Sequence, residues 1–459
     1  MAEARATSID GKTFTFHASV DGLELQPGSY ASLGESLGQV YTVDLLPGER
    51  GSVEGGGVLL EAGIAPFHDL PIGRADEERV GAWLESTRPK RAGLDVGELV
   101  SENGVRFLLD AGGFDRHTFF CGQSGSGKSY ALGAVLEQLL LETSLRIVVL
   151  DPNSDFVRVG SLRDGVDGDV ADRYRDATRG VAVRGGGEGA ERLHVRFTDF
   201  DAEEQAAVLR LDPIRDREEY GVLVELVEQG LETDASSAAE IAERLLGASD
   251  PERRSLGARL RNLGIHRWPI WSTGDEGSVQ DLSGAGGLRA LVVDLGSLES
   301  PGEKAIAAES VLAALWRRRA ERDPVLIVID EAHNVCPREP ADEVTALATE
   351  RAAQIAAEGR KFGLYLLVST QRPQRVNELV VSQCDNLVLM RMSSAADRAY
   401  LAETLSFAPG ALVERAGDFR PGEALVAGKI ASHPAFVRFG PRIAEEGGSD
   451  VPSSWADGS

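Results

Sequence analysis

A glycine-rich segment holds the residues best suited to chemistry in this chain of 459 residues. Residues 122–129 read GQSGSGKS and satisfy the pattern GxxxxGK[ST]. In such a loop the glycines let backbone N–H groups turn toward phosphate oxygens. Lys128 is suited to bridge the β- and γ-phosphates of ATP, and Ser129 to coordinate Mg²⁺. The predicted nucleotide-binding residues are Gly122, Ser124, Gly125, Ser126, Gly127, Lys128, Ser129 and Tyr130, with Lys128 also catalytic.

The elements around this loop fit the same chemistry. The apolar run TFFC precedes it, and an apolar stripe at helical spacing follows it, formed by Leu132, Val135, Leu136, Leu139 and Leu140. A strand, a loop and a helix are therefore expected in that order, with the positive N-terminal end of the helix facing the phosphates.

A second acidic segment completes the predicted site. Residues 324–331 read PVLIVIDE, which predicts a buried strand that ends in two carboxylates. Asp330 is expected to hold Mg²⁺, commonly through water, and Glu331 to polarise the water that attacks the γ-phosphate. The simpler alternative is an apolar strand that happens to end in acidic residues.

A helix that begins near Asp342 is expected to end in EGRKFG, residues 358–363, with Gly363 at its C-cap. Arg360 and Lys361 there either complement the helix dipole or reach the γ-phosphate of a neighbouring subunit as an arginine finger. We favour Arg360 as the catalytic finger. The next strand ends in STQRP, where Gln371 is either a γ-phosphate sensor or an ordinary polar loop residue.

The elements that must position these residues form a repeating series. Apolar runs alternate with helical stretches from TFFC through RIVVLD, LRALVVDL, PVLIVIDEA and GLYLLVST to DNLVLMRM. This alternation is typical of a parallel sheet flanked by helices, so an α/β fold is predicted. Short strands separated by turn residues between positions 13 and 61 predict a small N-terminal β-barrel.

These patterns give a domain plan. Its parts are a barrel and connector at 1–92, an ATPase domain at 93–443, a helical insertion at about 200–275, and a disordered acidic tail at 444–459. Residues 201–260 hold fifteen Asp and Glu against seven Arg, so the insertion is expected to avoid DNA.

Taken in order, GQSGSGKS, VLIVIDEAHNV, EGRKFG and STQRP resemble the HerA/FtsK superfamily, and the β-rich start resembles the barrel of HerA proteins. The resemblance covers roughly residues 13–440. It implies a RecA-like fold and a homohexameric ring with ATP sites between subunits. It also implies that Glu331 and Gln371 act in catalysis and that Arg360 acts in trans, with Arg116 a weaker finger candidate.

The chain departs from the family at LDPNSDF, where members typically read DPHGEY, so a role for Asp155 near the nucleotide is in doubt. The letters DEAH at 330–333 also occur in superfamily 2 helicases. That class needs a second RecA-like domain, for which the remaining residues hold no motifs.

Composition restricts the setting. No long apolar window or leader is present, and three separated cysteines indicate neither a disulfide framework nor a zinc site, so a cytoplasmic protein without a membrane anchor is expected. A formal charge of −25 excludes a surface that binds nucleic acid throughout. Residues 351–375 carry a local charge of +4 and either contact phosphates or form a solvated face.

The favoured interpretation is an ATP-driven, sequence-independent translocase or helicase on double-stranded DNA. It is expected to act in DNA repair, end resection or phage defence with a separate nuclease or effector, using ATP and Mg²⁺ as cofactors. Two alternatives remain open: a conjugation or secretion ATPase of the same superfamily, and a regulatory ATPase ring that scaffolds an effector.

Overall fold

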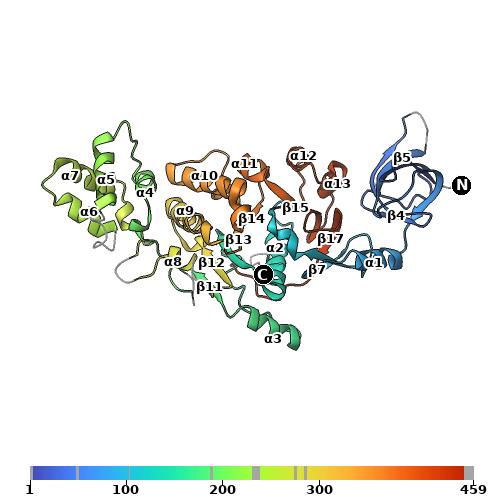
Figure 1. Ribbon diagram of the computed structural model, residues 1–459, viewed down its shortest axis with the longest axis horizontal. Helices are drawn as coiled ribbons and strands as arrows, with labels where there is room; N and C mark the ends of the chain where they lie inside the picture. The colour runs from blue at the N-terminus through green and yellow to red at the C-terminus, as the bar shows by residue number, and fades with distance from the viewer. Residues whose placement is uncertain are drawn as a thin grey trace, which may run out of the picture. The chain divides into compact units, whose positions relative to one another are not determined.

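The computed structural model describes residues 4–47, 51–102, 104–186, 190–229, 238–272, 276–283 and 287–448 (Figure 1). The chain divides into two compact units. The first unit contains Met1–Thr143, Gln371–Gln374 and Cys384–Arg442, and the second contains Ser144–Thr370, Arg375–Gln383 and Ile443–Ser459.

A closed six-stranded barrel begins the first unit. Its strands follow the order β1-β2-β5-β4-β3-β6, and each neighbouring pair is antiparallel. Alternate residues such as Phe14 and Phe16 point into the barrel core with Leu33 and Ile72, as expected of strands with one buried face. The strands are β1 (Arg5–Ser8), β2 (Thr13–Ser19), β3 (Tyr30–Leu33), β4 (Ser36–Leu45), β5 (Ser52–Leu59) and β6 (Phe67–Arg74).

The connector after the barrel holds a helix that the sequence analysis did not predict. Helix α1 (Glu77–Ser86) starts at Asp76, whose carboxylate accepts a hydrogen bond from the N–H of Arg79 at 2.7 Å. The charged composition of this segment obscured a short helix with a single fully buried side chain, Val80.

The rest of the first unit is a mixed sheet, the helix that follows the glycine-rich loop, and two shorter helices. Strand β9 pairs in parallel with β15, and antiparallel strands continue from β15 in the order β16, β17, β7 and β8. The strands are β7 (Gly93–Leu99), β8 (Arg106–Asp110), β9 (His117–Cys121), β15 (Cys384–Met390), β16 (Glu423–Gly428) and β17 (Ala435–Phe439). The helices are α2 (Lys128–Glu142), α12 (Ala395–Thr404) and α13 (Gly410–Glu414).

The second unit contains five parallel strands in the order β11-β12-β10-β13-β14. The central strands β12 and β13 are buried along their whole length, which explains their unbroken apolar sequence. The strands are β10 (Arg146–Asp151), β11 (Val181–Arg184), β12 (Ala290–Asp294), β13 (Val325–Ile329) and β14 (Leu364–Thr370). All six predicted apolar runs are strands, and the α/β fold class with a barrel is confirmed.

Helices make up the remainder of the second unit. Helices α9 and α10 pack against each other, and α5, α6 and α7 form a separate cluster within the segment predicted as an insertion (Figure 1). The helices are α3 (Gly168–Ala177), α4 (Ala202–Val208), α5 (Arg217–Gln229), α6 (Ala238–Leu246), α7 (Pro251–Asn262), α8 (Val279–Ser283), α9 (Pro301–Arg317), α10 (Glu343–Glu358) and α11 (Glu378–Val381).

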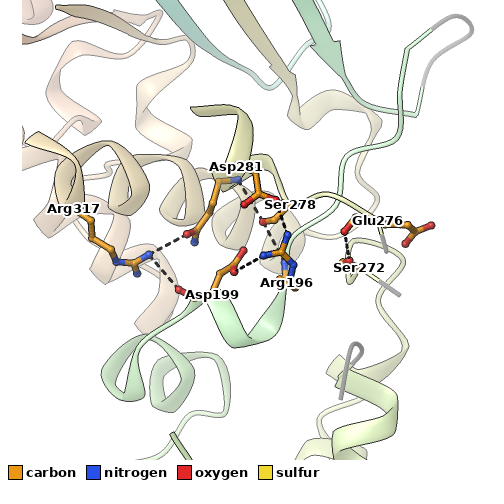
Figure 2. Close-up of polar contacts among 8 residues, drawn as sticks. Arg196, Asp199, Ser272, Glu276, Ser278, Asp281 and Arg317 are labelled. Carbon is orange, nitrogen blue, oxygen red and sulfur yellow. Dashed lines mark hydrogen bonds and ion pairs between the residues drawn. The ribbon is translucent and has the colours of Figure 1, made fainter. Parts of the chain in front are cut away.

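Polar contacts join the two ends of this helical segment, as Figure 2 shows. Arg196 lies between two carboxylates and donates to Asp199 at 3.0 Å and to Asp281 at 2.6 Å. Arg317 of α9 donates to the backbone carbonyl of Asp199 at 3.2 Å and to the side chain of Gln280 at 3.1 Å. The chain therefore enters and leaves the helical segment at one charged cluster.

The beginning of the predicted tail makes defined contacts. Ala444 is buried and bridges to Leu162, and Glu445 pairs with Arg158 at 3.2 Å. Residues 449–459, on which most of the disorder prediction falls, lie outside the described residues. Within the described ranges, no helix combines the length and the apolar character that crossing a membrane requires.

Candidate functional site

The glycine-rich loop has the predicted strand-loop-helix setting. Strand β9 is buried throughout, the loop occupies residues 122–127, and α2 begins at Lys128. Gly122 has no room for a side chain, because a Cβ atom there would lie 2.7 Å from the Cβ atom of Met390. Gly125 and Gly127 have φ angles of 72° and 90°, a region that favours glycine. Each motif glycine is thus required by space or by backbone conformation.

The start of α2 is arranged for an anion. Its N-cap is Gly127, which has no side chain to occupy the exposed N–H groups of the first turn. Those N–H groups and the positive end of the helix dipole are therefore available to an anion bound at the loop. Lys128 is 5% exposed, so its ammonium group is held within the loop region instead of extending into solvent.

The loop is held from the end of the neighbouring strand β15. The N–H of Gln123 donates to the carbonyl of Arg391 at 2.9 Å, and the N–H of Ser393 donates to the Gln123 side chain at 2.7 Å. The guanidinium of Arg391 donates to the carbonyl of Gly125 at 3.2 Å. Arg391 was not among the predicted site residues, and its only signal in the sequence is its position near the end of the run DNLVLMRM, directly after β15.

A second loop contacts the same turn from another direction. The N–H of Gly422 donates to the carbonyl of Ser126 at 2.8 Å, and Ser126 itself is fully buried. Carbonyl groups on both sides of the loop apex are thus satisfied by protein donors outside the loop. The N–H of Ser126, on the same peptide group as the Gly125 carbonyl, donates within the loop to the carbonyl of Gln123 at 3.1 Å.

A buried ion pair connects α2 to the C-terminal segment of the first unit. Arg442 and Glu137 are each 1% exposed and lie 2.7 Å apart. The Arg442 guanidinium occupies the space beside Gly133, where a Cβ atom would lie 2.3 Å from it. The N–H of Arg442 also donates to the hydroxyl of Tyr130 at 3.0 Å, so the predicted site residue Tyr130 is fixed by the C-terminal segment. Sequence reasoning missed this pair, because its members are 305 residues apart.

In the second unit, the predicted carboxylates follow β13. Asp330 is fully buried, and its N–H donates to the carbonyl of Leu150 at 3.1 Å. Glu331 is 4% exposed and has a φ of 42°, in the left-handed region that non-glycine residues avoid. His333 lies between Glu331 at 3.3 Å and the hydroxyl of Thr370 at 3.1 Å. A buried carboxylate on a strained backbone is typical of functional sites.

Asp151 at the end of β10 lies near Asp330 in the same unit. Its carboxylate accepts the N–H groups of Asp155 at 3.0 Å and Phe156 at 2.8 Å. Burial raises the pKa of Asp151 to about 7. The two hydrogen bonds favour the charged form and oppose this increase, and the charge of Asp330 adds to it. The turn after Asp151 is fixed by Ser154, which donates to Asp294 at 2.7 Å.

The remaining predicted residues occupy less buried positions. Helix α10 begins at Asp342 as expected but ends at Glu358. The residues Gly359–Phe362 form a 3₁₀ turn, η7, and Gly363 caps that turn instead of α10. Arg360 lies on this turn and is exposed, and Gln371 is half-buried at the start of the short segment that belongs to the first unit.

Arg116, the weaker finger candidate, is paired within the first unit. It lies 2.9 Å from Asp115 and 3.7 Å from Asp385. The structure thus groups the loop residues, Arg391 and Arg116 in the first unit. It groups Asp151, Asp330, Glu331 and Arg360 in the second. The catalytic roles of Glu331, Arg360 and Gln371 stay predictions.

Several known proteins are similar to this chain. A family model described as the central domain of helicase HerA matches residues 94–266. The DNA double-strand break repair helicase HerA of Saccharolobus solfataricus is 24% identical over 396 residues, which cover 82% of this chain and 73% of that protein. The HerA of Sulfurisphaera tokodaii is 31% identical over 167 residues, so the match spans 35% of this chain and only 33% of that relative.

Among solved structures, VirB4 of Thermoanaerobacter pseudethanolicus has a similar fold. The TM-score is 0.51 at 16% identity, and the match covers 76% of this chain and 96% of VirB4. At this identity the likeness concerns the fold alone. The strand-loop-helix geometry of residues 117–142 and the HerA match across the central region make the chain similar to HerA-like P-loop ATPases.

Proposed function

We propose that this HerA-type ATPase is a motor that translocates double-stranded DNA as a homohexameric ring without reading base sequence. The observation that carries the proposal is the geometry of residues 122–128, where positive-φ glycines and an uncapped helix start are arranged for phosphates. Relatives named as DNA double-strand break repair helicases support a DNA substrate. The motor is proposed to act beside a separate nuclease or effector.

Lys128 binds the β- and γ-phosphates in this proposal, and Glu331 orients the attacking water. Ser129 and Asp330 are the oxygen donors for Mg²⁺, which supplies charge neutralisation at the phosphates. Within the described residues, no cluster of three or more His, Cys, Asp or Glu side chains forms a ready-made metal site. Mg²⁺ is usually bound by one or two protein oxygens together with nucleotide phosphates and water.

The DNA contact is proposed to involve the basic stretch 351–375. Arg360, Arg372 and Arg375 have exposed side chains. Phosphate contacts by such residues position a duplex without specifying its sequence. The strongly acidic remainder of the chain would repel DNA from other surfaces, which favours a local contact.

The test is the steady-state ATPase rate of the purified protein with and without linear duplex DNA, at low and high salt. Duplex DNA should stimulate the rate, and stimulation should fall as salt rises. Lys128→Ala should abolish nucleotide binding or turnover. Glu331→Gln should still bind ATP but reduce kcat by about 100-fold or more. Glu339→Gln, at an exposed position eight residues further on, is the matched control and should retain activity.

Each outcome bears on a different part of the proposal. ATPase activity that is indifferent to DNA would overturn the translocase function and favour a scaffolding or secretion role. Normal turnover in Glu331→Gln would remove the water-orienting assignment. For the trans finger, Arg360→Ala subunits mixed with Glu331→Gln subunits should recover some hydrolysis. Absence of recovery at every mixing ratio would contradict that assignment.

A further inference from the structure

The P-loop has a charged support that its own motif does not contain. Arg391 is the first residue after β15, and β15 runs parallel to β9 with Leu389 opposite Cys121. This register brings residue 391 beside the loop that follows β9. The guanidinium of Arg391 then reaches the loop apex and donates to the carbonyl of Gly125.

We propose that Arg391 is a positioning residue for nucleotide binding. It holds the Gly125 carbonyl outward and so fixes the turn of residues 125–127, which presents the first N–H groups of α2 to the nucleotide phosphates. The inference rests on the proposed ATPase function and adds a residue outside the GxxxxGK[ST] motif to the phosphate-binding machinery.

The backbone of a phosphate-binding loop explains the need for such a residue. When successive N–H groups turn inward toward an anion, the intervening carbonyl groups turn outward and need donors of their own. The carbonyl of Ser126 has the N–H of Gly422 at 2.8 Å. The carbonyl of Gly125 has Arg391 at 3.2 Å. Gly125 has a φ of 72° and lacks a side chain, so its backbone is intrinsically adaptable. The peptide group that follows it is held on its other side by the N–H of Ser126, which donates to the carbonyl of Gln123 at 3.1 Å.

The Arg391 side chain is directed to the loop and not to another partner. Among the described residues, its Nε atom is buried without a hydrogen-bond partner, and no carboxylate forms an ion pair with it. The bond to Gly125 is therefore the interaction that fixes the guanidinium. A charged donor forms a stronger hydrogen bond than a neutral one, and its positive charge also favours an anion bound at the same loop.

Residues next to Arg391 hold the other side of the loop. The N–H of Ser393 donates to the Gln123 side chain at 2.7 Å, and the carbonyl of Arg391 accepts the N–H of Gln123 at 2.9 Å. Arg398 in turn donates to the carbonyl groups of Met392 at 2.8 Å and Ser393 at 2.9 Å. Hydrogen bonds thus hold segment 391–393 in place on both of its sides, and Arg391 is the charged residue through which this segment contacts the loop.

The experiment compares ADP and ATP binding with turnover in Arg391→Ala and Arg391→Lys. Arg391→Ala should raise the Kd for ADP and the KM for ATP about tenfold, while kcat at saturating ATP changes by less than about threefold. Arg391→Lys keeps a charged donor and should recover part of the affinity. Arg88→Ala, which breaks an exposed ion pair with Glu85 at 3.0 Å, is the matched control and should bind as wild type.

A purely structural role for Arg391 predicts something different. It would lower the melting temperature of the nucleotide-free protein and reduce kcat and affinity together, without rescue by lysine. Either that pattern or an unchanged Kd in Arg391→Ala would overturn the inference. Failure of the wild-type protein to bind ADP or ATP would instead overturn the proposed ATPase function, so the two failures are distinguishable.

Discussion

The N-terminal barrel and the helical insertion are attached to their respective units by different chemistry. In the first unit, the hydroxyl of Tyr30 in the barrel lies 2.5 Å from Nε2 of His433, whose Nδ1 is 3.0 Å from the Ser432 hydroxyl. The rings of Trp83 and Phe107 contact the same imidazole edge-on. This anchor is buried, aromatic and uncharged.

The insertion is attached through charges. Glu204 of α4 is 2% exposed, and it bonds with Arg317 of α9 and lies 3.7 Å from Arg351 of α10. Arg351 also lies 3.6 Å from Glu309, which is 1% exposed. Two arginine side chains thus lie beside two buried carboxyl groups. The strength of this anchor therefore depends on which of the carboxyl groups is ionised.

Because one anchor is uncharged and the other is charged, the two attachments should respond to pH in opposite directions. Burial lowers the pKa of His433 to about 3, so the imidazole is neutral in the folded protein. Burial raises the pKa of Glu309 to about 8, although Arg351 opposes this shift, so the carboxyl is protonated at neutral pH. Acid should therefore weaken the barrel anchor, and alkali the insertion anchor.

The largest expected effect comes from His433→Ala. It removes two hydrogen bonds and the ring contacts, so the opening free energy of strand β3 should fall by about 3 kcal/mol. Hydrogen exchange in Tyr30–Leu33 measures this fall. His17→Ala, on an exposed position of β2, should leave it unchanged, and equal effects of the two variants would contradict the anchor role.

Mild acid should weaken the same contact without a mutation. An unfolded histidine has a pKa near 6.5, and His433 has a lower value in the fold, so its contribution is complete above that pH and is lost as pH falls. Between pH 7 and pH 5 the loss should be about 2 kcal/mol. Urea unfolding of the isolated wild-type protein, followed by proteolysis within the barrel, would detect it. A barrel equally resistant at both values would exclude a neutral His433 anchor.

Arg317→Ala tests the charged anchor. Glu204 would lose its closest partner while remaining buried, and we expect α4 to open more easily by about 2 kcal/mol, with Arg351 limiting the cost. Arg318→Ala is the adjacent control, since that side chain is 44% exposed and pairs only with Glu321 at 3.0 Å among the described residues. Hydrogen exchange in Ala202–Val208 should change in the first variant alone.

An effect of similar size is expected for Glu309. Its pKa is raised in the fold, so its stabilising contribution is present at low pH and is lost as pH rises through about 8. Glu309→Gln cannot ionise and should gain about 2 kcal/mol relative to the wild type between pH 6 and pH 8. Unfolding midpoints in urea at the two pH values give this difference. A wild type and variant with parallel pH profiles would show that Glu309 is already charged.

Local patterns were sufficient for the parts of the molecule that depend on neighbouring residues. The apolar run before Gly122 and the helical stripe after Lys128 predicted β9 and α2, and the run before Asp330 predicted β13. Helix α1 escaped notice because its charged sequence buries little apolar surface. The C-terminus of α10 was placed one 3₁₀ turn too late, because Gly363 caps the turn and not the helix.

Glycine positions and periodicity within about fifteen residues were enough to predict the glycine-rich loop, the series of buried strands and the separate β-rich start. The contacts of Arg391 with Gly125, of Arg442 with Glu137 and of His433 with Tyr30 appear only in the folded chain. These contacts join residues 266 to 403 positions apart, and they depend on strand order, which local periodicity does not encode.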